Sequence, residues 1–146
     1  MNMVETTLAI LKPDAVLNLQ SGQIINMIEL NGFGIAAMHK IMLSREEAEA
    51  FYAVHSKRSF FNELVEYMIS GPVIVMALTK ENAVKEWREL MGATNPEEAG
   101  PGTIRRMFGE SIANNAVHGS DSMENAEKEI AFFFEEGACD DEECED

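Results

Sequence analysis

The chain has 146 residues, of which 46% are hydrophobic and 25% are charged, values typical of a single folded domain. Its net charge of −15 argues against a general nucleic-acid surface, because phosphate backbones are bound by clustered lysine and arginine. No apolar run approaches the roughly 20 residues that span a bilayer, and the first residues lack the basic and apolar regions of a signal peptide. We therefore expect no membrane segment and a cytoplasmic location.

The excess of negative charge is concentrated at one end of the chain. Residues 135–146 hold eight acidic side chains and no basic one. We therefore expect residues 1–136 to form the domain and residues 137–146 to be a disordered acidic tail. Both cysteines, Cys139 and Cys144, lie in this tail without a nearby histidine, so they make an incomplete zinc site. We expect them to have no function, the alternative being a weak metal or redox site or the binding of a partner.

The first elements alternate between strand and helix. The apolar run at residues 5–11, rich in β-formers and stopped by Lys12-Pro13, predicts a buried strand. Residues 22–30 place apolar side chains on a broad helical face, and Asn31-Gly32 marks the end of this helix. The following stretch, residues 33–43, predicts a second strand.

Two helices are expected next, followed by another strand. Ser44 and Glu47 have the spacing of a capping box, which predicts a helix over residues 45–55. Residues 60–70 predict another helix, ended by Gly71-Pro72. The apolar stretch from Pro72 to Thr79 is the clearest buried strand in the sequence.

The last part of the chain combines regular elements with a long loop. Residues 81–92 have the pattern of an amphipathic helix, and a loop rich in proline and glycine follows. A short helical turn is predicted near residues 104–108. Residues 122–134 predict a helix that runs into an apolar strand or into a terminal packing contact.

This order of elements predicts one α+β domain, an α/β sandwich. It fits the β-α-β-β-α-β succession of ferredoxin-like domains, with extra helices and a long loop. We expect a four-stranded antiparallel sheet with helices covering one face. The fold alone implies no function.

The segment NNAVHGSDS, residues 114–122, places His118 on a bend of small and polar residues. A neutral imidazole is a good nucleophile near pH 7 and can carry a phosphoryl group. Phosphoryl transfer also requires cations and hydroxyl groups, and the sequence supplies Lys12, Arg88, Thr94, Arg105 and Ser120. Taken singly, such a histidine is more often structural, and such arginines are more often surface charges.

The remaining histidines and the aromatic residues have ordinary explanations. His39 falls in a strand and His55 at the end of a helix, and we assign neither a chemical role. Tyr52, Phe60 and Phe61 suit a core, although a nucleotide site often stacks its base on an exposed ring.

Five segments, taken in order and with their spacing, carry a resemblance to a known family: LAILKPDAV, FYAVH, FFNELVEYMISGPV, LMGATNPEEAGPGTIR and NNAVHGSDS. Together they resemble nucleoside diphosphate kinase over residues 5–134. The pairing of GATNP…GTIR with N-x-x-HGSDS is the most specific part. The resemblance implies exchange of the γ-phosphate between nucleoside triphosphates and diphosphates, ATP and GTP included, through a phosphohistidine, with broad base specificity.

The resemblance also assigns roles to residues of this sequence. His118 would be the nucleophile, with Ser120 and Glu129 orienting its ring and Tyr52 beside the phosphoryl path. Lys12 would meet the phosphates and, with Asn115, the ribose 3′-hydroxyl. The remaining contacts would come from Arg88, Thr94 and Arg105 to the phosphates and from Phe60 and Ile112 to the base. The family uses Mg²⁺ carried by the nucleotide and bound to no protein side chain directly, and it forms homo-oligomers, tetramers or hexamers built from a common dimer.

Three positions depart from the residues common in the family: Ala15 stands for glycine, Ser59 for proline and Asn114 for arginine. Ser59 removes a rigid residue next to Phe60, and Asn114 removes a cation near a loop that family members use in subunit contacts. The alternative function is a nucleotide-binding regulatory or scaffold protein without turnover, which the loss of Lys12 or His118 would favour. Neither of these residues is lost.

Overall fold

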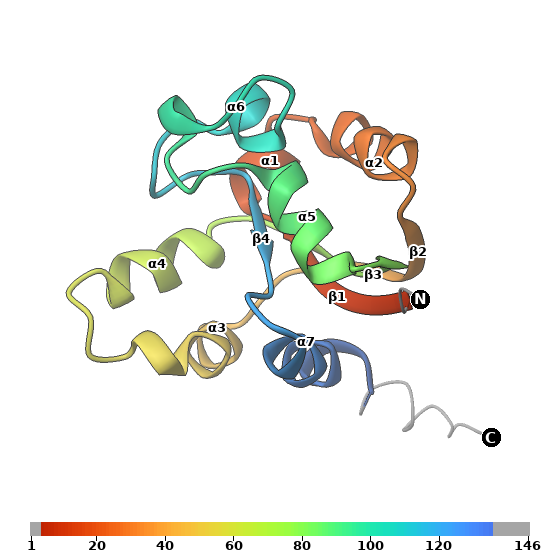
Figure 1. Ribbon diagram of the computed structural model, residues 1–146. Coiled ribbons are helices and arrows are strands. Elements are labelled where there is room, and N and C mark those ends of the chain that lie inside the picture. Colours follow the sequence, from red (N-terminus) through yellow and green to blue (C-terminus); the bar gives the residue numbers. More distant parts are fainter. Residues whose placement is uncertain (1–3, 136–146) are drawn as a thin grey trace.

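The computed structural model describes residues 4–135, so the predicted tail at residues 137–146 lies outside the described part. Figure 1 shows the path of the chain. The elements in chain order are β1 Val4–Leu11, α1 Pro13–Leu17, α2 Ser21–Leu30, β2 Gly34–Ile41, α3 Arg45–Phe51, η1 Ala53–His55, α4 Phe61–Met68, β3 Val73–Glu81, α5 Ala83–Met91, η2 Pro96–Glu98, α6 Ile104–Phe108, β4 Val117–Gly119, α7 Met123–Ile130 and η3 Ala131–Glu135.

Four strands form one antiparallel sheet in the order β2-β3-β1-β4, which confirms the predicted ferredoxin-like arrangement. The fourth strand is β4, only three residues long, and it carries His118. The residues around His118 indicate a bend, and the apolar stretch after residue 130 is compatible with a strand or with a terminal contact. That stretch instead forms the π-helical turn η3, whose Phe133 and Phe134 pack against the core, so the terminal-contact alternative is correct.

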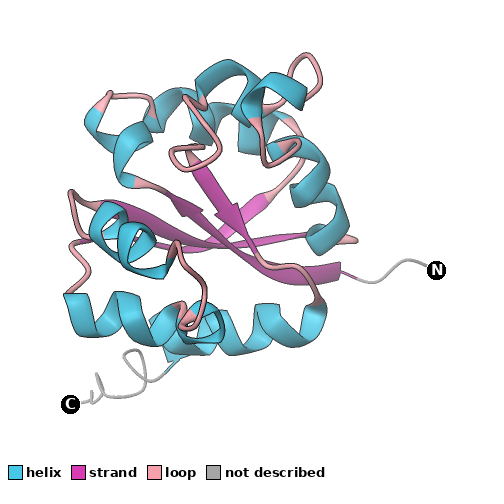
Figure 2. Ribbon diagram, turned by 90° about the vertical axis from the view of Figure 1, so that its left-hand side faces the viewer, coloured by secondary structure: helices cyan, strands magenta, loops and turns pink. Residues whose placement is uncertain are grey.

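Helices cover both faces of the sheet, and the expectation of one covered face is wrong (Figure 2). One core lies between the sheet and helices α2, α5 and α6, with Ile24, Trp87 and Ile104 fully buried. The other joins the sheet to α3, α4 and the end of the chain through residues such as Val65. Consecutive residues of β1 alternate between these two cores, Leu8 and Ile10 in one, Ala9 and Leu11 in the other. A strand buried on both faces has this continuous apolar sequence.

The predicted helix signals are present in the structure. The Ser44 side chain accepts a hydrogen bond from the Glu47 amide at 3.0 Å, and the Glu47 carboxylate accepts one from the Ser44 amide at 2.9 Å. This capping box begins α3, which ends at Phe51, sooner than predicted, with η1 following. Proline at its first position begins α1, a short helix that the sequence pattern does not predict.

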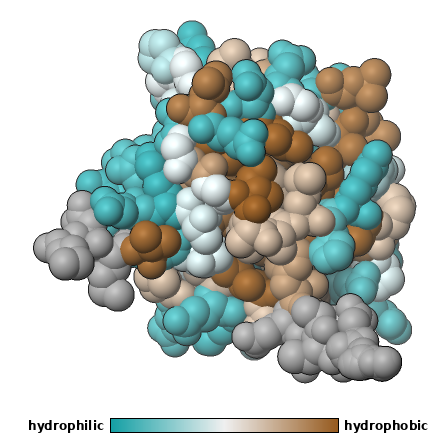
Figure 3. All heavy atoms as spheres, turned by 90° about the vertical axis from the view of Figure 1, so that its right-hand side faces the viewer, coloured by the Kyte–Doolittle hydropathy of each residue, from teal (hydrophilic) through white to brown (hydrophobic). Residues whose placement is uncertain are grey.

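One side of the molecule exposes apolar side chains. Figure 3 views the molecule from the side on which α2 and β2 lie in Figure 1. Apolar side chains gather in the middle of this face. Leu30 of α2 and Met38 of the edge strand β2 are 76% and 49% exposed. Within residues 4–135, the helices lack the combination of length and apolar character that a membrane span requires.

Candidate active site

His118 lies in the middle of β4, opposite Ile10 of β1, and is held through one ring nitrogen. Its Nε2 is 3.1 Å from Oε1 of Glu129, and the Ser120 hydroxyl donates to the same oxygen at 2.8 Å. A carboxylate accepts hydrogen bonds only, so Nε2 carries the proton and the lone pair is on Nδ1. The structure thus brings Ser120 and Glu129 together at His118, with Ser120 bonded to Glu129 and not to the ring itself.

The backbone on both sides of His118 is fixed by side chains from two helices. Arg105 of α6 donates from Nη2 to the carbonyl of Val117 at 2.9 Å, and Trp87 of α5 donates from Nε1 to the carbonyl of His118 at 3.2 Å. A Cβ on Gly119 would lie 2.5 Å from the Trp87 ring, so only glycine permits this close approach. Ala116, just before the strand, has a φ of 78°, a strained conformation for a residue with a side chain.

Lys12 follows the end of β1, and its side chain is 8% exposed. Its ammonium donates to Oδ1 of Asn115 at 2.9 Å, and Asn115 in turn donates from Nδ2 to the carbonyl of Thr94 at 3.1 Å. Burial, reinforced by the charge of Arg105, lowers the pKa of Lys12 to about 8, while Asp14 opposes the shift. The structure thus joins three residues predicted for the site, Lys12, Asn115 and Thr94.

Arg105 is the second buried cation. Its Nη1 donates to the carbonyl of Gly92 at 3.0 Å, whereas its Nε is buried without a hydrogen-bond partner among residues 4–135. Burial and then the charge of Arg88 lower the pKa of Arg105 to about 10. An unpaired buried donor of this kind is available to an anion.

His118 and Arg105 face a cavity of about 170 Å³. Its walls include His118 and three of the residues predicted to bind phosphate: Arg88, Thr94 and Arg105. The pKa of His118 is lowered, first by burial and further by the charges of Lys12 and Arg105, although Glu129 opposes the shift. The imidazole is therefore neutral, and hence nucleophilic, across the neutral pH range.

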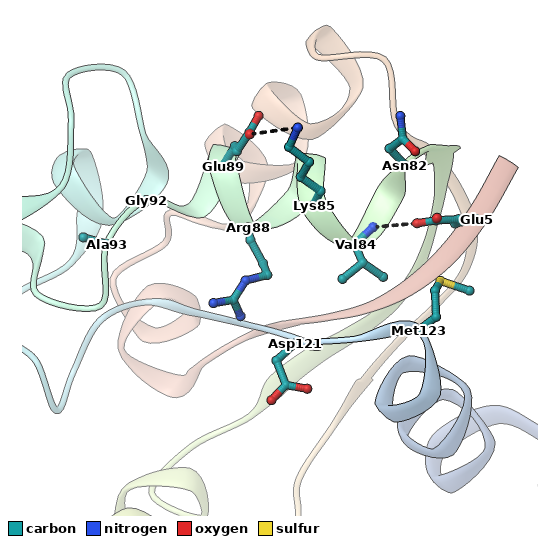
Figure 4. A pocket seen from close by; sticks show the side chains of 10 residues that line it. All are labelled: Glu5, Asn82, Val84, Lys85, Arg88, Glu89, Gly92, Ala93, Asp121 and Met123. Atoms are coloured by element: carbon teal, nitrogen blue, oxygen red, sulfur yellow. Dashed lines mark hydrogen bonds and ion pairs between the residues drawn. The ribbon is translucent and has the colours of Figure 1, made fainter. Parts of the chain in front are cut away.

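A larger hollow of about 700 Å³ adjoins this cavity and shares Arg88, Gly92 and Ala93 with it. Figure 4 shows Arg88 extending from α5 toward the segment that carries Asp121. A hydrogen bond from Asn125 lowers the pKa of Asp121, and the charge of Arg88 adds to this effect. Asp121 is not among the residues predicted for the site.

The predicted base contacts lie apart from the cavity walls. Phe60 precedes α4 and is 42% exposed, and Ile112 is 59% exposed. Exposed apolar side chains at these positions are open to a flat ring. Tyr52, by contrast, is 6% exposed, and its ring centroid is 6.2 Å from that of His118. Its buried hydroxyl has no hydrogen-bond partner in the described part of the chain, and burial raises its pKa, with a further contribution from Glu129.

Two aromatic residues at the site were missed by sequence reasoning. Phe51 approaches the His118 ring edge-on with centroids 5.4 Å apart, and Trp87 holds the His118 carbonyl. Both read as ordinary core residues of amphipathic helices, and only the three-dimensional arrangement relates them to His118. His39, to which no chemical role is assigned, stacks on Phe134 with ring centroids 5.3 Å apart.

No group of three or more histidine, cysteine, aspartate or glutamate side chains within residues 4–135 is placed to hold a metal ion. Glu129 beside His118 accepts a hydrogen bond from Ser120, and Asp121 on the following segment accepts one from Asn125. A divalent cation bound by nucleotide phosphates is compatible with this arrangement, because Mg²⁺ generally keeps most of its ligands from phosphate and water.

The model of one protein family, described as nucleoside diphosphate kinase, matches residues 5–139. The chain belongs to the nucleoside diphosphate kinase family. A nucleoside diphosphate kinase of Nitratiruptor sp. is 64% identical over 131 residues, which cover 90% of this chain and 96% of that protein. One of Chlamydia abortus is 62% identical over 131 residues, covering 90% of this chain and 93% of that protein.

Solved structures of the family agree with the fold. The Aquifex aeolicus nucleoside diphosphate kinase superposes with a TM-score of 0.89 at 45% identity, covering 90% of this chain and 96% of the other. A halophilic member from Halobacterium salinarum, in complex with CDP, superposes with a TM-score of 0.87 at 36% identity. The match covers 90% of this chain and 88% of the other. The family transfers the γ-phosphate of a nucleoside triphosphate to a nucleoside diphosphate, and membership assigns this phosphotransferase activity to the chain. It does not favour the alternative of a regulatory or scaffold protein without turnover.

Proposed function

We propose that this nucleoside diphosphate kinase uses Nδ1 of His118 as its nucleophile. The observation that carries the proposal is the hydrogen bond between Nε2 and Glu129, which leaves the lone pair on Nδ1. In the first half-reaction, Nδ1 attacks the γ-phosphorus and the bond to the β–γ bridging oxygen breaks, so that a nucleoside diphosphate leaves. In the second, a terminal oxygen of an acceptor diphosphate attacks the same phosphorus, and the P–N bond breaks.

The roles of the surrounding residues follow from their places in the site. Arg88, Thr94 and Arg105 line the cavity and would hold the β- and γ-phosphates. Lys12, already bonded to Asn115, would reach the phosphates, and this pair would bind the ribose 3′-hydroxyl. Preorganised cations of this kind neutralise the charge that phosphoryl transfer spreads over the oxygens.

Tyr52, with its unpaired hydroxyl beside His118, would contact the transferred phosphoryl group. Phe60 and Ile112, both exposed, would enclose the base from its two sides. Stacking is tolerant of base identity because every base has a π-face, so we propose broad nucleotide specificity, including ATP and GTP.

Mg²⁺ would arrive bound to the nucleotide phosphates, where it would neutralise charge and orient the γ-phosphate. Arg88, Thr94, Arg105 and Lys12 would then bind and orient the Mg²⁺–nucleotide complex as substrate. We also propose a cytoplasmic location.

We propose a homo-oligomeric assembly. The edge strand β2 and the exposed apolar side chains Leu30 and Met38 near it support this, since sheet edges and apolar patches are common contact surfaces. Residues 1–136 would form the catalytic domain, and residues 137–146 would be an appendage to it. Light scattering of the purified protein measures the number of subunits.

The kinetic test is the dependence of the initial rate on both substrates. A covalent intermediate predicts parallel lines when the reciprocal rate is plotted against the reciprocal of the ATP concentration at several fixed concentrations of an acceptor diphosphate. Lines that intersect would indicate direct transfer between two bound nucleotides and would overturn the proposal. His118→Ala should abolish exchange while retaining the fold, as judged by circular dichroism.

A further inference from the structure

Phe60, the ring proposed to stack on the base, is held only weakly by burial. It follows residues 56–59, all of them exposed, and is itself 42% exposed, whereas its neighbour Phe61 packs against the core. An exposed aromatic side chain keeps much of its rotamer freedom unless neighbouring groups restrict it. The orientation of this ring therefore depends on the side chains that lie directly against it.

His55 is one such side chain. The centroids of the His55 and Phe60 rings are 5.7 Å apart and their planes are inclined at 53°, within the range of favourable aromatic pairs. The imidazole also lies nearly parallel to the ring of Tyr52, with 6.5 Å between centroids and 27° between planes. Because Tyr52 is 6% exposed, the half-buried His55 connects the exposed Phe60 ring to a fixed, buried one.

Arg58 is the second side chain against Phe60. Its Cζ lies over the ring at 5.8 Å from the ring centre, a distance typical of a cation–π contact. The Arg58 amide donates to the carbonyl of His55 at 2.9 Å, and the Arg58 carbonyl accepts from the amide of Phe61 at 3.1 Å. These turns bring both side chains to the same ring. A guanidinium over one face of Phe60 leaves the opposite face for a planar base.

We propose that His55 and Arg58 are positioning residues that hold the Phe60 ring in the orientation in which it stacks on the base. Neither lines the cavity that contains His118, so they act through Phe60 and not on the phosphates. The inference rests on the proposed function in that Phe60 is taken to contact the base. It adds two side chains, remote from the phosphates, that determine how strongly the base contributes to nucleotide binding.

The test separates the base from the rest of the nucleotide. Two phosphoryl donors are compared in single-turnover phosphorylation of the protein: ATP, and 1-deoxyribose 5-triphosphate, which has the triphosphate and the 3′-hydroxyl but no base. With ATP, kcat/KM should fall about two- to tenfold in His55→Ala, because an aromatic pair is lost. It should fall about two- to fivefold in Arg58→Ala, because an exposed cation–π contact is lost.

The base-free donor and saturating ATP show whether these losses are specific. Both variants should react with the base-free donor as the wild type does, and the rate at saturating ATP should be unchanged, since only binding of the base is weakened. Equal losses with the two donors would indicate a general disturbance of the site and would overturn the proposal. An unchanged kcat/KM with ATP in both variants would overturn it as well.

A double-mutant cycle shows whether His55 acts through Phe60. In a Phe60→Ala background, His55→Ala should cause no further loss with ATP, because the ring that His55 positions is already gone. A full additional loss would mean that the imidazole contacts the nucleotide itself, contrary to a positioning role. His55→Phe keeps an aromatic ring and should restore kcat/KM to within about twofold of the wild type.

Lys57→Ala is the matched control for Arg58→Ala, because it removes an exposed cation from the preceding position of the same loop. It should leave kcat/KM unchanged with both donors, and a loss equal to that of Arg58→Ala would show that net charge alone is responsible. Failure of the proposed base contact has a different signature, in which Phe60→Ala leaves kcat/KM with ATP unchanged. If the positioning role alone fails, Phe60→Ala lowers this value while His55→Ala and Arg58→Ala do not.

Discussion

At the scale of single residues, the reactivity of the site depends on how His118 is held. One carboxylate oxygen of Glu129 accepts hydrogen bonds from both the imidazole Nε2 and the Ser120 hydroxyl. This arrangement fixes the tautomer, and it stabilises positive charge on the ring when Nδ1 bonds to phosphorus. The ring of His118, the proposed nucleophile, is thus oriented by a single acid from α7.

Glu129→Gln should therefore lower kcat. The amide can present an oxygen to Nε2, but it provides no negative charge, and each pKa unit of lost interaction corresponds to about 1.4 kcal/mol, or about tenfold in rate. We expect a loss of at least about tenfold in single-turnover phosphorylation of the enzyme. Ser120→Ala leaves the Nε2 contact in place and should lower this rate less, by about fivefold, because only one hydrogen bond is lost. Equal rates in wild type and Glu129→Gln would contradict this role.

The pH dependence of kcat/KM follows from two shifted groups. His118 reacts in its neutral form, so activity rises as pH increases through its pKa, which burial holds below 6.5. Lys12 acts in its protonated form, so activity falls as pH increases through about 8. The profile should be bell-shaped, with its plateau between these limits. In Lys12→Arg the alkaline limb should disappear below pH 10, and its persistence there would show that another group causes it.

At the scale of elements, His118 is positioned by the close contact of β4 with α5. Gly119 lies against Trp87 and Met91, with no room for a side chain atom. The two helices that reach β4 fix it differently, since α5 packs against Gly119 and α6 sends Arg105 to the carbonyl of Val117.

Gly119→Ala should destabilise the protein by about 1–3 kcal/mol, because the new methyl group forces β4 away from the Trp87 ring. Urea denaturation measures this loss, and kcat should fall at the same time because His118 moves with the strand. Gly22→Ala is the control. A Cβ at Gly22 of α2 meets no atom within 4 Å, so this change should be neutral or stabilise by up to about 1 kcal/mol. Similar effects of the two substitutions would refute the close-contact argument.

The helices and strands differ in how well the sequence predicts them. The strands β1, β2 and β3 and the helix α5 have long, regular apolar patterns, and their approximate positions were predicted. The strand β4 has three residues, too few for a period to be recognised, and it forms because β1 offers an edge to it. The second covered face could have been predicted, since the continuous apolar run of β1 is typical of a strand buried on both sides.

The candidate site was predicted through motifs and not through geometry. Lys12 and Asn115 are 103 positions apart, and no pattern of spacing reveals that their side chains meet. The resemblance to the family selected them, and the structure then showed the contact. Phe51 carried no such signal, because it reads as an ordinary helix residue.

At the scale of the whole molecule, the charge is divided between a compact domain and an acidic end. Residues 135–146 contain eight of the 26 acidic side chains, whereas the buried cations Lys12 and Arg105 belong to the site. An anionic substrate must approach a protein of net charge −15, so cations gathered at one cavity provide the local attraction.

Deleting residues 137–146 should leave the exchange rate and the subunit count unchanged, because the side chains proposed for the site all lie within residues 12–129. Coupled-enzyme assays and light scattering on the truncated and full-length chains test this. Loss of activity or of assembly on truncation would show that the acidic end belongs to the functional unit.

The central claim is that the γ-phosphate passes through His118. The most direct measurement is to incubate the protein with [γ-³²P]ATP and Mg²⁺ without an acceptor, separate it from nucleotide, and locate the label by mass spectrometry. We predict one acid-labile phosphoryl group per chain on His118, discharged when unlabelled nucleoside diphosphate is added and absent in His118→Ala. Label that persists in His118→Ala, or an active wild type that carries none, would contradict the account.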